Sequence, residues 1–137
     1  MTVATPKTQA VLGFAGGSSF DLPGVKLDVK TAFVSLILTP LDDAPLAASK
    51  HILVTAMARD KQTGTEYSED GARLVKAGGP PLLMEPVIAT ITLKGAAPAE
   101  VRAVDLYGVP TEVKLPVSAG SFVIDGRYQS YYYEVKR

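Results

Sequence analysis

The side chains of this chain that are best suited to hold a ligand are tyrosines near its C-terminus. Tyr128, Tyr131, Tyr132 and Tyr133 lie close together in a short segment. Exposed aromatic rings stack on the apolar faces of sugar rings, while their hydroxyls form hydrogen bonds. Tyrosine is also a favoured strand residue that packs across a sheet, so core packing is the competing interpretation. In a strand, Tyr131 and Tyr133 share one face and Tyr132 and Glu134 share the other, so at least one ring must point inward.

A second candidate is the polar segment Arg59–Tyr67, which combines cations, an acid, an amide and an aromatic ring. Such a mixture in one long loop can line a cleft that binds a polyol. A solvated hairpin of the same composition is the alternative, and the sequence does not separate the two. Five side chains from the two segments are taken as candidate carbohydrate-binding residues: Arg59, Tyr67, Tyr128, Tyr131 and Tyr133.

Carboxylates are the remaining reactive groups. Glycosidases use two acids separated by roughly 5 to 10 Å, and Asp42–Asp43 and Glu69–Asp70 are adjacent acids. Both pairs fall in expected loops, where adjacent acids are mostly solvated turn residues. Glu66 together with Glu69 and Asp70 forms an alternative cluster for a structural calcium ion, although the acids lack the spacing of a dedicated calcium loop.

The chain lacks the side chains that most other catalytic sites and metal sites require. The chain has no cysteine, no tryptophan and one histidine, His51, which begins the apolar run 51–57. Nucleophilic triads and transition-metal sites mostly need imidazole or thiolate groups brought together. We therefore expect no catalytic residue, no transition-metal site and no cofactor, and we expect His51 to be an ordinary strand residue. The absence of tryptophan weakens a strong carbohydrate-stacking platform.

Length and charge narrow the class of protein further. The 137 residues fit one domain, 1–137, and 47% hydrophobic residues can build a real core. Fourteen basic residues balance fourteen acidic ones without forming a stripe, so nothing favours nucleic acid or an anionic membrane. The longest apolar stretch, Phe33–Leu38, is far shorter than the roughly 20 residues of a membrane helix. Met1–Pro6 lacks the basic and apolar regions of a signal peptide.

Strands must position these groups. Val25–Lys30 alternates apolar and charged residues, which is the pattern of a strand with one buried face. Phe33–Thr39 is more continuously apolar and suits a central strand buried on both sides, and His51–Arg59 suits a second central strand. The glycine-rich stretch 60–81 is expected to be a functional loop or an irregular excursion with a short strand near Leu74. About ten short strands predict an all-β fold, an antiparallel β-sandwich of jelly-roll or immunoglobulin-like type.

Several segments also carry a family resemblance. They are TPKTQAVLGF (5–14), FVSLILTPLDDAPL (33–46), SKHILVTAMAR (49–59), the pair Thr63–Gly64, PLLMEPV (81–87) and YYYEV (131–135). Their order resembles the C-terminal β-sandwich accessory domains, similar to carbohydrate-binding modules, that follow the barrel of large bacterial glycoside hydrolases. The likeness covers nearly the whole chain, but it contains no sharp chemical motif.

The resemblance implies a non-catalytic module of a polysaccharide-degrading enzyme, because the catalytic acids of such enzymes lie on the barrel. Its implied partners are a polysaccharide or oligosaccharide and the neighbouring catalytic domain of the same polypeptide. Its implied location is extracellular or periplasmic. Some appended sandwiches bind glycans, and others only pack against the barrel. The missing tryptophan departs from typical carbohydrate-binding modules.

Two main hypotheses follow. The first is weak glycan binding, in the micromolar to millimolar range, through exposed tyrosines and polar loops; it predicts an exposed coplanar pair of rings. The second is a structural domain without a ligand of its own; it predicts buried rings and an exposed apolar patch of several hundred Å². A small enzyme that uses carboxylates alone is a third alternative.

Overall fold

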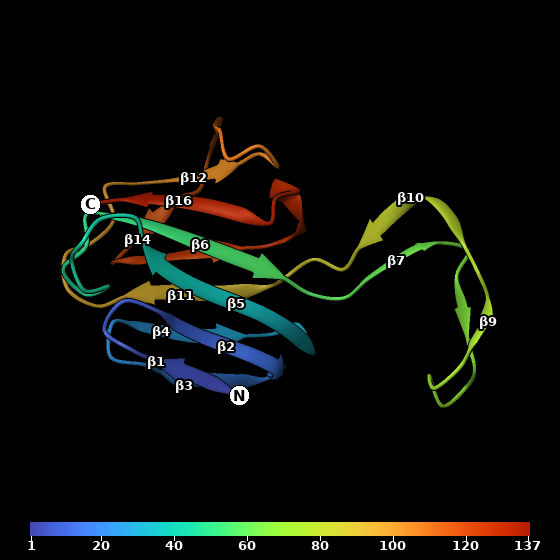
Figure 1. The fold of residues 1–137 in the computed structure, drawn as a ribbon. Helices are drawn as coiled ribbons and strands as arrows, with labels where there is room; N and C mark the ends of the chain where they lie inside the picture. The colour runs from blue at the N-terminus through green and yellow to red at the C-terminus, as the bar shows by residue number, and fades with distance from the viewer.

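Two antiparallel sheets make up most of the molecule (Figure 1). The computed structural model describes residues 1–137. The larger sheet has the strand order β1 (Thr2–Ala4), β2 (Gln9–Phe14), β5 (Phe33–Pro40), β6 (His51–Met57), β16 (Tyr132–Lys136), β12 (Glu100–Val104) and β13 (Pro110–Lys114). The smaller sheet has the order β14 (Val117–Ser118), β15 (Ser121–Ile124), β11 (Ala89–Leu93), β4 (Val25–Val29) and β3 (Ser18–Asp21).

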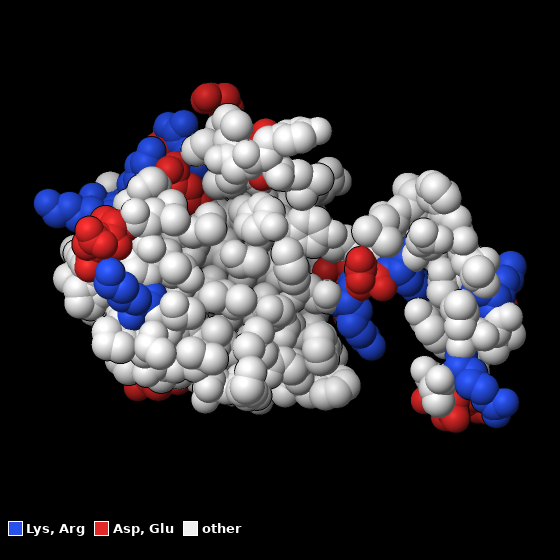
Figure 2. All heavy atoms as spheres, viewed as in Figure 1, with Lys and Arg blue, Asp and Glu red and all other residues white.

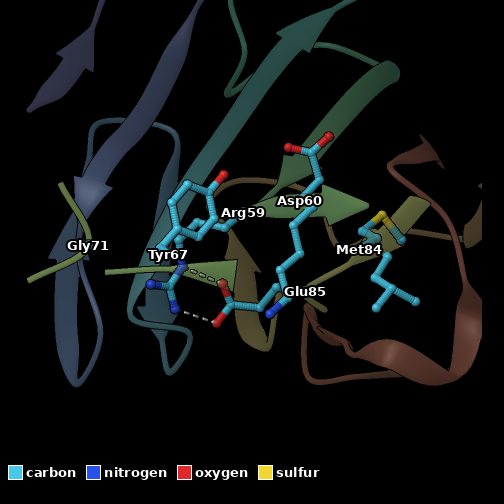
Figure 3. Close-up of a pocket in the computed structure, with 8 residues that line it drawn as sticks. Arg59, Asp60, Tyr67, Gly71, Met84 and Glu85 are labelled. Atoms are coloured by element: carbon cyan, nitrogen blue, oxygen red, sulfur yellow. Dashed lines mark hydrogen bonds and ion pairs between the residues drawn. The ribbon is translucent and has the colours of Figure 1, made fainter. Parts of the chain in front are cut away.

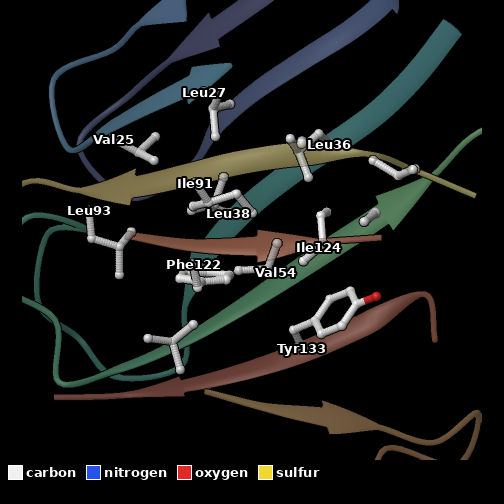
Figure 4. Packing of buried hydrophobic residues seen from close by; sticks show 14 of the residues in the cluster. Val25, Leu27, Leu36, Leu38, Val54, Ile91, Leu93, Phe122, Ile124 and Tyr133 are labelled. Atoms are coloured by element: carbon white, nitrogen blue, oxygen red, sulfur yellow. The ribbon is translucent and has the colours of Figure 1, made fainter. Parts of the chain in front are cut away.

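The two sheets share one hydrophobic core. A cluster of 24 buried residues takes side chains from both sheets. Figure 4 shows Leu27, Ile91 and Phe122 of the smaller sheet beside Leu38 and Val54 of the larger one. Removing this much apolar surface from water is the main force that holds such a fold together. The arrangement is all-β and antiparallel, as the sequence predicts, and it is consistent with a β-sandwich.

The alternation of residue types sets which face of each strand is buried. In β4, Val25, Leu27 and Val29 are buried while Lys26 is exposed. In β5 buried and half-buried residues alternate along the whole strand. The prediction that Phe33–Thr39 is buried on both faces is therefore wrong, because only one face of β5 meets the core and nothing covers the other completely.

A long ribbon projects from one end of the two sheets (Figure 1). It begins after β6 with β7 (Asp60–Thr63), which pairs with β10 (Gly79–Met84). Farther out, β8 (Glu66–Tyr67) pairs with β9 (Leu74–Lys76). We call residues 59–85 the arm and all other residues the body. The arm is the segment for which the sequence predicts a functional loop or irregular excursion, and the predicted short strand near Leu74 is β9.

The chain forms sixteen strands, more than the expected ten or so. The additional strands are short or belong to the arm, where no period-two apolar pattern marks them. The single helical segment is a 3-10 turn, Gly126–Tyr128. No helix has the length and apolar character needed to cross a membrane.

The C-terminal residue ties several loops of the body together. The guanidinium of Arg137 donates hydrogen bonds to the carbonyl oxygens of Ala47 and Lys94, each at 2.8 Å, and longer ones to those of Leu46 and Ser49. Partial burial lowers the pKa of Arg137. One side chain thus fixes the chain end against the connections that follow β5 and β11.

Candidate functional site

The most distinct polar site lies where the arm leaves the body. Arg59 Nε donates to Glu85 Oε2 at 2.8 Å, and Arg59 Nη2 donates to Glu85 Oε1 at 3.2 Å (Figure 3). The backbone N–H of Glu85 also donates to the carbonyl of Arg59 at 2.9 Å. These contacts join the first and last residues of the arm, so they close its base in a planar, two-bond geometry that arginine is suited to make.

The pair is also coupled electrostatically. Hydrogen bonds from the Arg59 side chain lower the pKa of Glu85, and the same contact raises the pKa of Arg59. Both groups therefore stay charged at neutral pH. The Arg59 side chain is well exposed, so water and salt screen the attraction and its contribution to stability is small.

A cleft of about 720 Å³ opens beside this pair. Its lining consists of Arg59, Asp60, Lys61, Tyr67, Gly71, Leu83, Met84 and Glu85. Figure 3 shows these side chains around the ion pair. Two of the five predicted carbohydrate-binding residues, Arg59 and Tyr67, thus line the same cleft. Tyr67 is about half exposed, so its ring is available to stack on a ligand.

The predicted C-terminal tyrosines do not join this cleft, and they form no open platform. Tyr133 belongs to the core and is 2% exposed, and its hydroxyl donates to the Ser130 carbonyl at 3.1 Å. Its ring meets that of Tyr128 edge-to-face, with centroids 6.4 Å apart. Burial raises the pKa of Tyr133 to about 12. The prediction that Tyr133 offers its ring to a ligand is therefore wrong, since its place in the register of β16 points it inward.

The other rings of this segment are partly exposed. Tyr128 packs against the core cluster as a half-buried side chain. The rings of Tyr131 and Tyr132 are 6.4 Å apart and tilted by 60°. A flat sugar cannot lie on both of these rings at once, so the segment lacks the coplanar pair that a stacking platform would need.

The acids that the sequence offered as catalytic or calcium-binding groups are engaged locally. Asp42 accepts hydrogen bonds from the backbone of Lys50 and Ala44, and these contacts lower its pKa. Glu66 pairs with Lys76 at 3.1 Å, and Asp70 accepts from Ser68. No group of three or more acidic or histidine side chains is arranged to hold a metal ion. Glu66 thus takes part in an ion pair, and Asp70 accepts hydrogen bonds within a turn.

His51 lies on the outer face of the larger sheet with an unexpected partner. Its Nε2 is 2.6 Å from Oε1 of Glu134, a carboxylate that is only 8% exposed. Lys136 Nζ is 3.2 Å from the other carboxylate oxygen, Oε2, in an ion pair without hydrogen-bond geometry. The contact between His51 and Glu134 thus links the side chains of the neighbouring strands β6 and β16. The sequence could not reveal it, because it depends on β6 pairing with β16.

The arm carries a feature that the sequence analysis missed. Leu74, Val75 and Leu82 are each more than half exposed, and Leu83 is only slightly less so. Figure 2 shows the outer arm as largely uncharged surface with a few charges at its ends. The sequence predicted no strand at PLLM (81–84), and the place of this segment on a projecting ribbon is what makes Leu82 and Leu83 accessible.

The body exposes an aromatic side chain where β2 ends and β5 begins. Phe14 is 86% exposed and packs edge-to-face on Phe33, with ring centroids 5.3 Å apart. The adjacent loop joins the root of the arm, because Thr31 Oγ1 donates to the carbonyl of Pro86 at 2.9 Å and accepts from the N–H of Ile88 at 2.8 Å.

A groove lies on the outer face of the larger sheet, and the buried carboxylate of Glu134 is among the groups that line it. Its volume is about 420 Å³, and Leu41, Leu53, Leu106, Tyr107 and Tyr132 are among its lining residues. Tyr107 is almost fully exposed on a turn that Asp105 caps by accepting from the N–H groups of Tyr107 and Val109. Tyr107 is therefore an exposed aromatic residue outside the arm, and it can serve as a control for substitutions in the arm.

Comparison with protein-family models, with curated proteins and with solved structures gives no match for this chain.

Proposed function

We propose that this chain is a non-catalytic docking module, in which the body is a β-sandwich base and the arm packs against another folded protein surface. The arm is the observation that carries this proposal. An isolated two-stranded ribbon is only marginally stable in water, and it normally needs further strands or a packed face. Leu74, Val75, Leu82 and Leu83 instead face solvent. Exposed apolar side chains that are concentrated on one projecting ribbon favour an interaction site.

Residues 59–85 contain four basic and five acidic side chains, so the charges of the arm nearly balance and favour a weakly charged partner surface. Arg59 pairs with Glu85, and Lys76 pairs with Glu66, so these ions are already compensated within the arm. A strongly charged partner would gain little from them. The resemblance to accessory domains of glycoside hydrolases makes a catalytic barrel of the same polypeptide the first partner to test, as part of a secreted enzyme.

The test measures binding of this chain to the barrel of a glycoside hydrolase that carries a sandwich of this type, by calorimetry with the two parts as separate chains. We expect binding that the combined substitutions Leu82→Ser and Leu83→Ser weaken at least about tenfold, because hot spots concentrate in buried apolar contacts. Tyr107→Ser is the matched control and should bind like the unmodified chain. Absence of binding, or equal binding by the arm variant, would contradict docking through the arm.

Weak glycan binding is the second candidate, and the cleft beside the Arg59–Glu85 pair favours it. Tyr67 supplies an exposed ring, while Arg59, Asp60 and Lys61 supply donors and acceptors for hydroxyl groups. Only one ring borders this cleft, so affinity should not exceed the micromolar to millimolar range.

Affinity electrophoresis against a panel of plant and algal polysaccharides tests this second candidate. Retardation that Tyr67→Ala abolishes and Tyr107→Ala preserves would support binding in the cleft. Retardation that survives Tyr67→Ala would move the site elsewhere, and no retardation by any polysaccharide would count against glycan binding.

A further inference from the structure

The groove on the outer face of the larger sheet combines an apolar lining with one charged side chain. Three neighbouring strands form its floor (Figure 1). Leu53 of β6 is paired with Glu134 of β16, and Tyr132 of β16 is paired with Val104 of β12. Leu106, in the turn after β12, adds a wall. Glu134 is the only charged residue that lines the groove, whose volume of about 420 Å³ is in the range of small-molecule sites.

The carboxylate of Glu134 is buried and lacks a hydrogen bond at one oxygen. Glu134 is 8% exposed, and no donor forms a hydrogen bond with its Oε2. A buried charge is costly unless it is both paired and hydrogen-bonded. Buried polar atoms without a hydrogen bond are uncommon in folded proteins, so this oxygen favours a donor that comes from outside the chain.

The cations near Glu134 leave Oε2 open to such a donor. His51 Nε2 contacts the other oxygen, Oε1, at 2.6 Å. Arg102 is paired with Glu134 across the strands, but its guanidinium donates to Glu100. Lys136 Nζ is 3.2 Å from Oε2 without hydrogen-bond geometry, and its side chain is about half exposed. The ammonium of Lys136 can therefore turn into water at little cost when another donor approaches Oε2.

We propose that the groove binds a primary ammonium ion on a short apolar chain, a free alkylamine. The ammonium donates to Oε2 of Glu134 in place of Lys136, and the apolar chain lies over Leu53 beside the ring of Tyr132. An ammonium is a compact charge with three donors, so one acceptor oxygen can hold it. A guanidinium prefers two oxygens side by side, and His51 occupies one of them. The groove is separate from the arm, so this inference goes beyond the docking function.

Titration of the isotope-labelled chain, followed by two-dimensional NMR, tests the class of ligand. The probe is n-hexylammonium, and n-hexanol is its control because it has the same apolar chain without a charge. We expect n-hexylammonium to shift the amide signals of Leu53, Tyr132 and Glu134. It should bind at least about tenfold more tightly than n-hexanol, because hydrogen bonds between charged groups are the strong ones. n-Hexyltrimethylammonium, which has the charge but no N–H donor, should bind more weakly than n-hexylammonium.

Three substitutions separate ligand binding by Glu134 from a purely structural role. Glu134→Gln keeps the shape of the side chain and removes its charge, so it should raise the dissociation constant of n-hexylammonium at least about tenfold. Lys136→Met removes the competing ammonium and should lower that constant about twofold to fivefold, as expected for the loss of an exposed ion pair. Glu66→Gln makes the same chemical change in a paired acid of the arm, and it should bind like the unmodified chain.

The spectrum of each variant without ligand establishes that it is folded. Lys136→Met alters a half-exposed side chain, so it decides the question even if Glu134→Gln is unstable. A lower affinity of Lys136→Met, or an affinity equal to that of the unmodified chain, would mean that Oε2 is not the acceptor.

Three further outcomes would overturn the proposal. Equal binding of n-hexylammonium and n-hexanol would mean that the groove is only an apolar surface. The absence of any shift at Leu53, Tyr132 and Glu134 would exclude the groove as the site. Tighter binding of Nα-acetyl-lysine methylamide than of n-hexylammonium would replace the free amine by a lysine side chain of a polypeptide. None of these outcomes bears on docking through the arm, which its own substitutions test.

Discussion

The body and the arm use the same kinds of residue in opposite ways. In the body, leucine and valine alternate with polar residues and disappear into a core shared by two sheets. In the arm, Leu74 and Leu82 occupy strands that have no second sheet behind them, and they remain in contact with water. The body thus derives its stability from burial within one chain. The arm has apolar side chains that remain exposed, and this difference supports the proposal that the arm is the part that meets another molecule.

The largest change in the free energy of unfolding should appear when one buried leucine of the body is truncated. Leu36 is fully buried between the sheets, so Leu36→Ala removes apolar contacts and leaves a cavity. We expect the free energy of unfolding to fall by about 2–5 kcal/mol. Urea denaturation measures it. A loss below about 1 kcal/mol would mean that the core rearranges around Leu36, and that the body is looser than its packing indicates.

Arg137 should come next, because it joins loops that lie far apart in the sequence. Arg137→Ala leaves the carbonyls of Ala47 and Lys94 without their charged donor. We expect a loss of about 1–3 kcal/mol in the free energy of unfolding. Arg127→Ala is the control, since its pair with Asp125 is largely exposed and should contribute under about 1 kcal/mol. Equal effects of the two substitutions would contradict the anchoring role of the C-terminal residue.

The body was largely predictable from the sequence, and the arm was not. Alternation in Val25–Lys30 reflects a local rule, since successive side chains of a strand point to opposite faces. The inward direction of Tyr133 depends on which strands pair and in what register, and neighbouring aromatic residues give no signal for that choice. The exposure of Leu82 and Leu83 is even harder to predict from neighbouring residues. The motif PLLM does not indicate whether another sheet will cover it.

The candidate site shows the same limit. Arg59 and Tyr67 were grouped in the sequence because they are close together in one segment, and both line the cleft. Glu85, which fixes Arg59 by two hydrogen bonds, was not identified as its partner. Glu85 is the last residue of the arm in sequence, and only the pairing of β7 with β10 brings it next to Arg59. Local composition can therefore suggest the polar cleft, while the long-range pairing decides its geometry.

Tyr133 provides a spectroscopic test of the body. Its pKa in the folded protein is raised from 10.0 to about 12 by burial, so the fold favours the protonated phenol. This stabilisation is complete below pH 10, and it is lost as the pH rises from about 10 toward 12, where the unfolded chain releases the proton more readily. Ultraviolet titration should show a late tyrosine ionisation that Tyr133→Phe removes. A titration without that late step would mean that water reaches the ring.

The smallest effect should come from a leucine of the arm. Leu74→Ala makes the same chemical change as Leu36→Ala, but the Leu74 side chain is more than half exposed, so little apolar contact is lost. We expect the free energy of unfolding to change by less than about 0.5 kcal/mol. Urea denaturation under the conditions used for Leu36→Ala gives the direct comparison. A loss near 2 kcal/mol would mean that Leu74 is buried in the monomer in solution, and the arm would then be part of the core instead of a docking element.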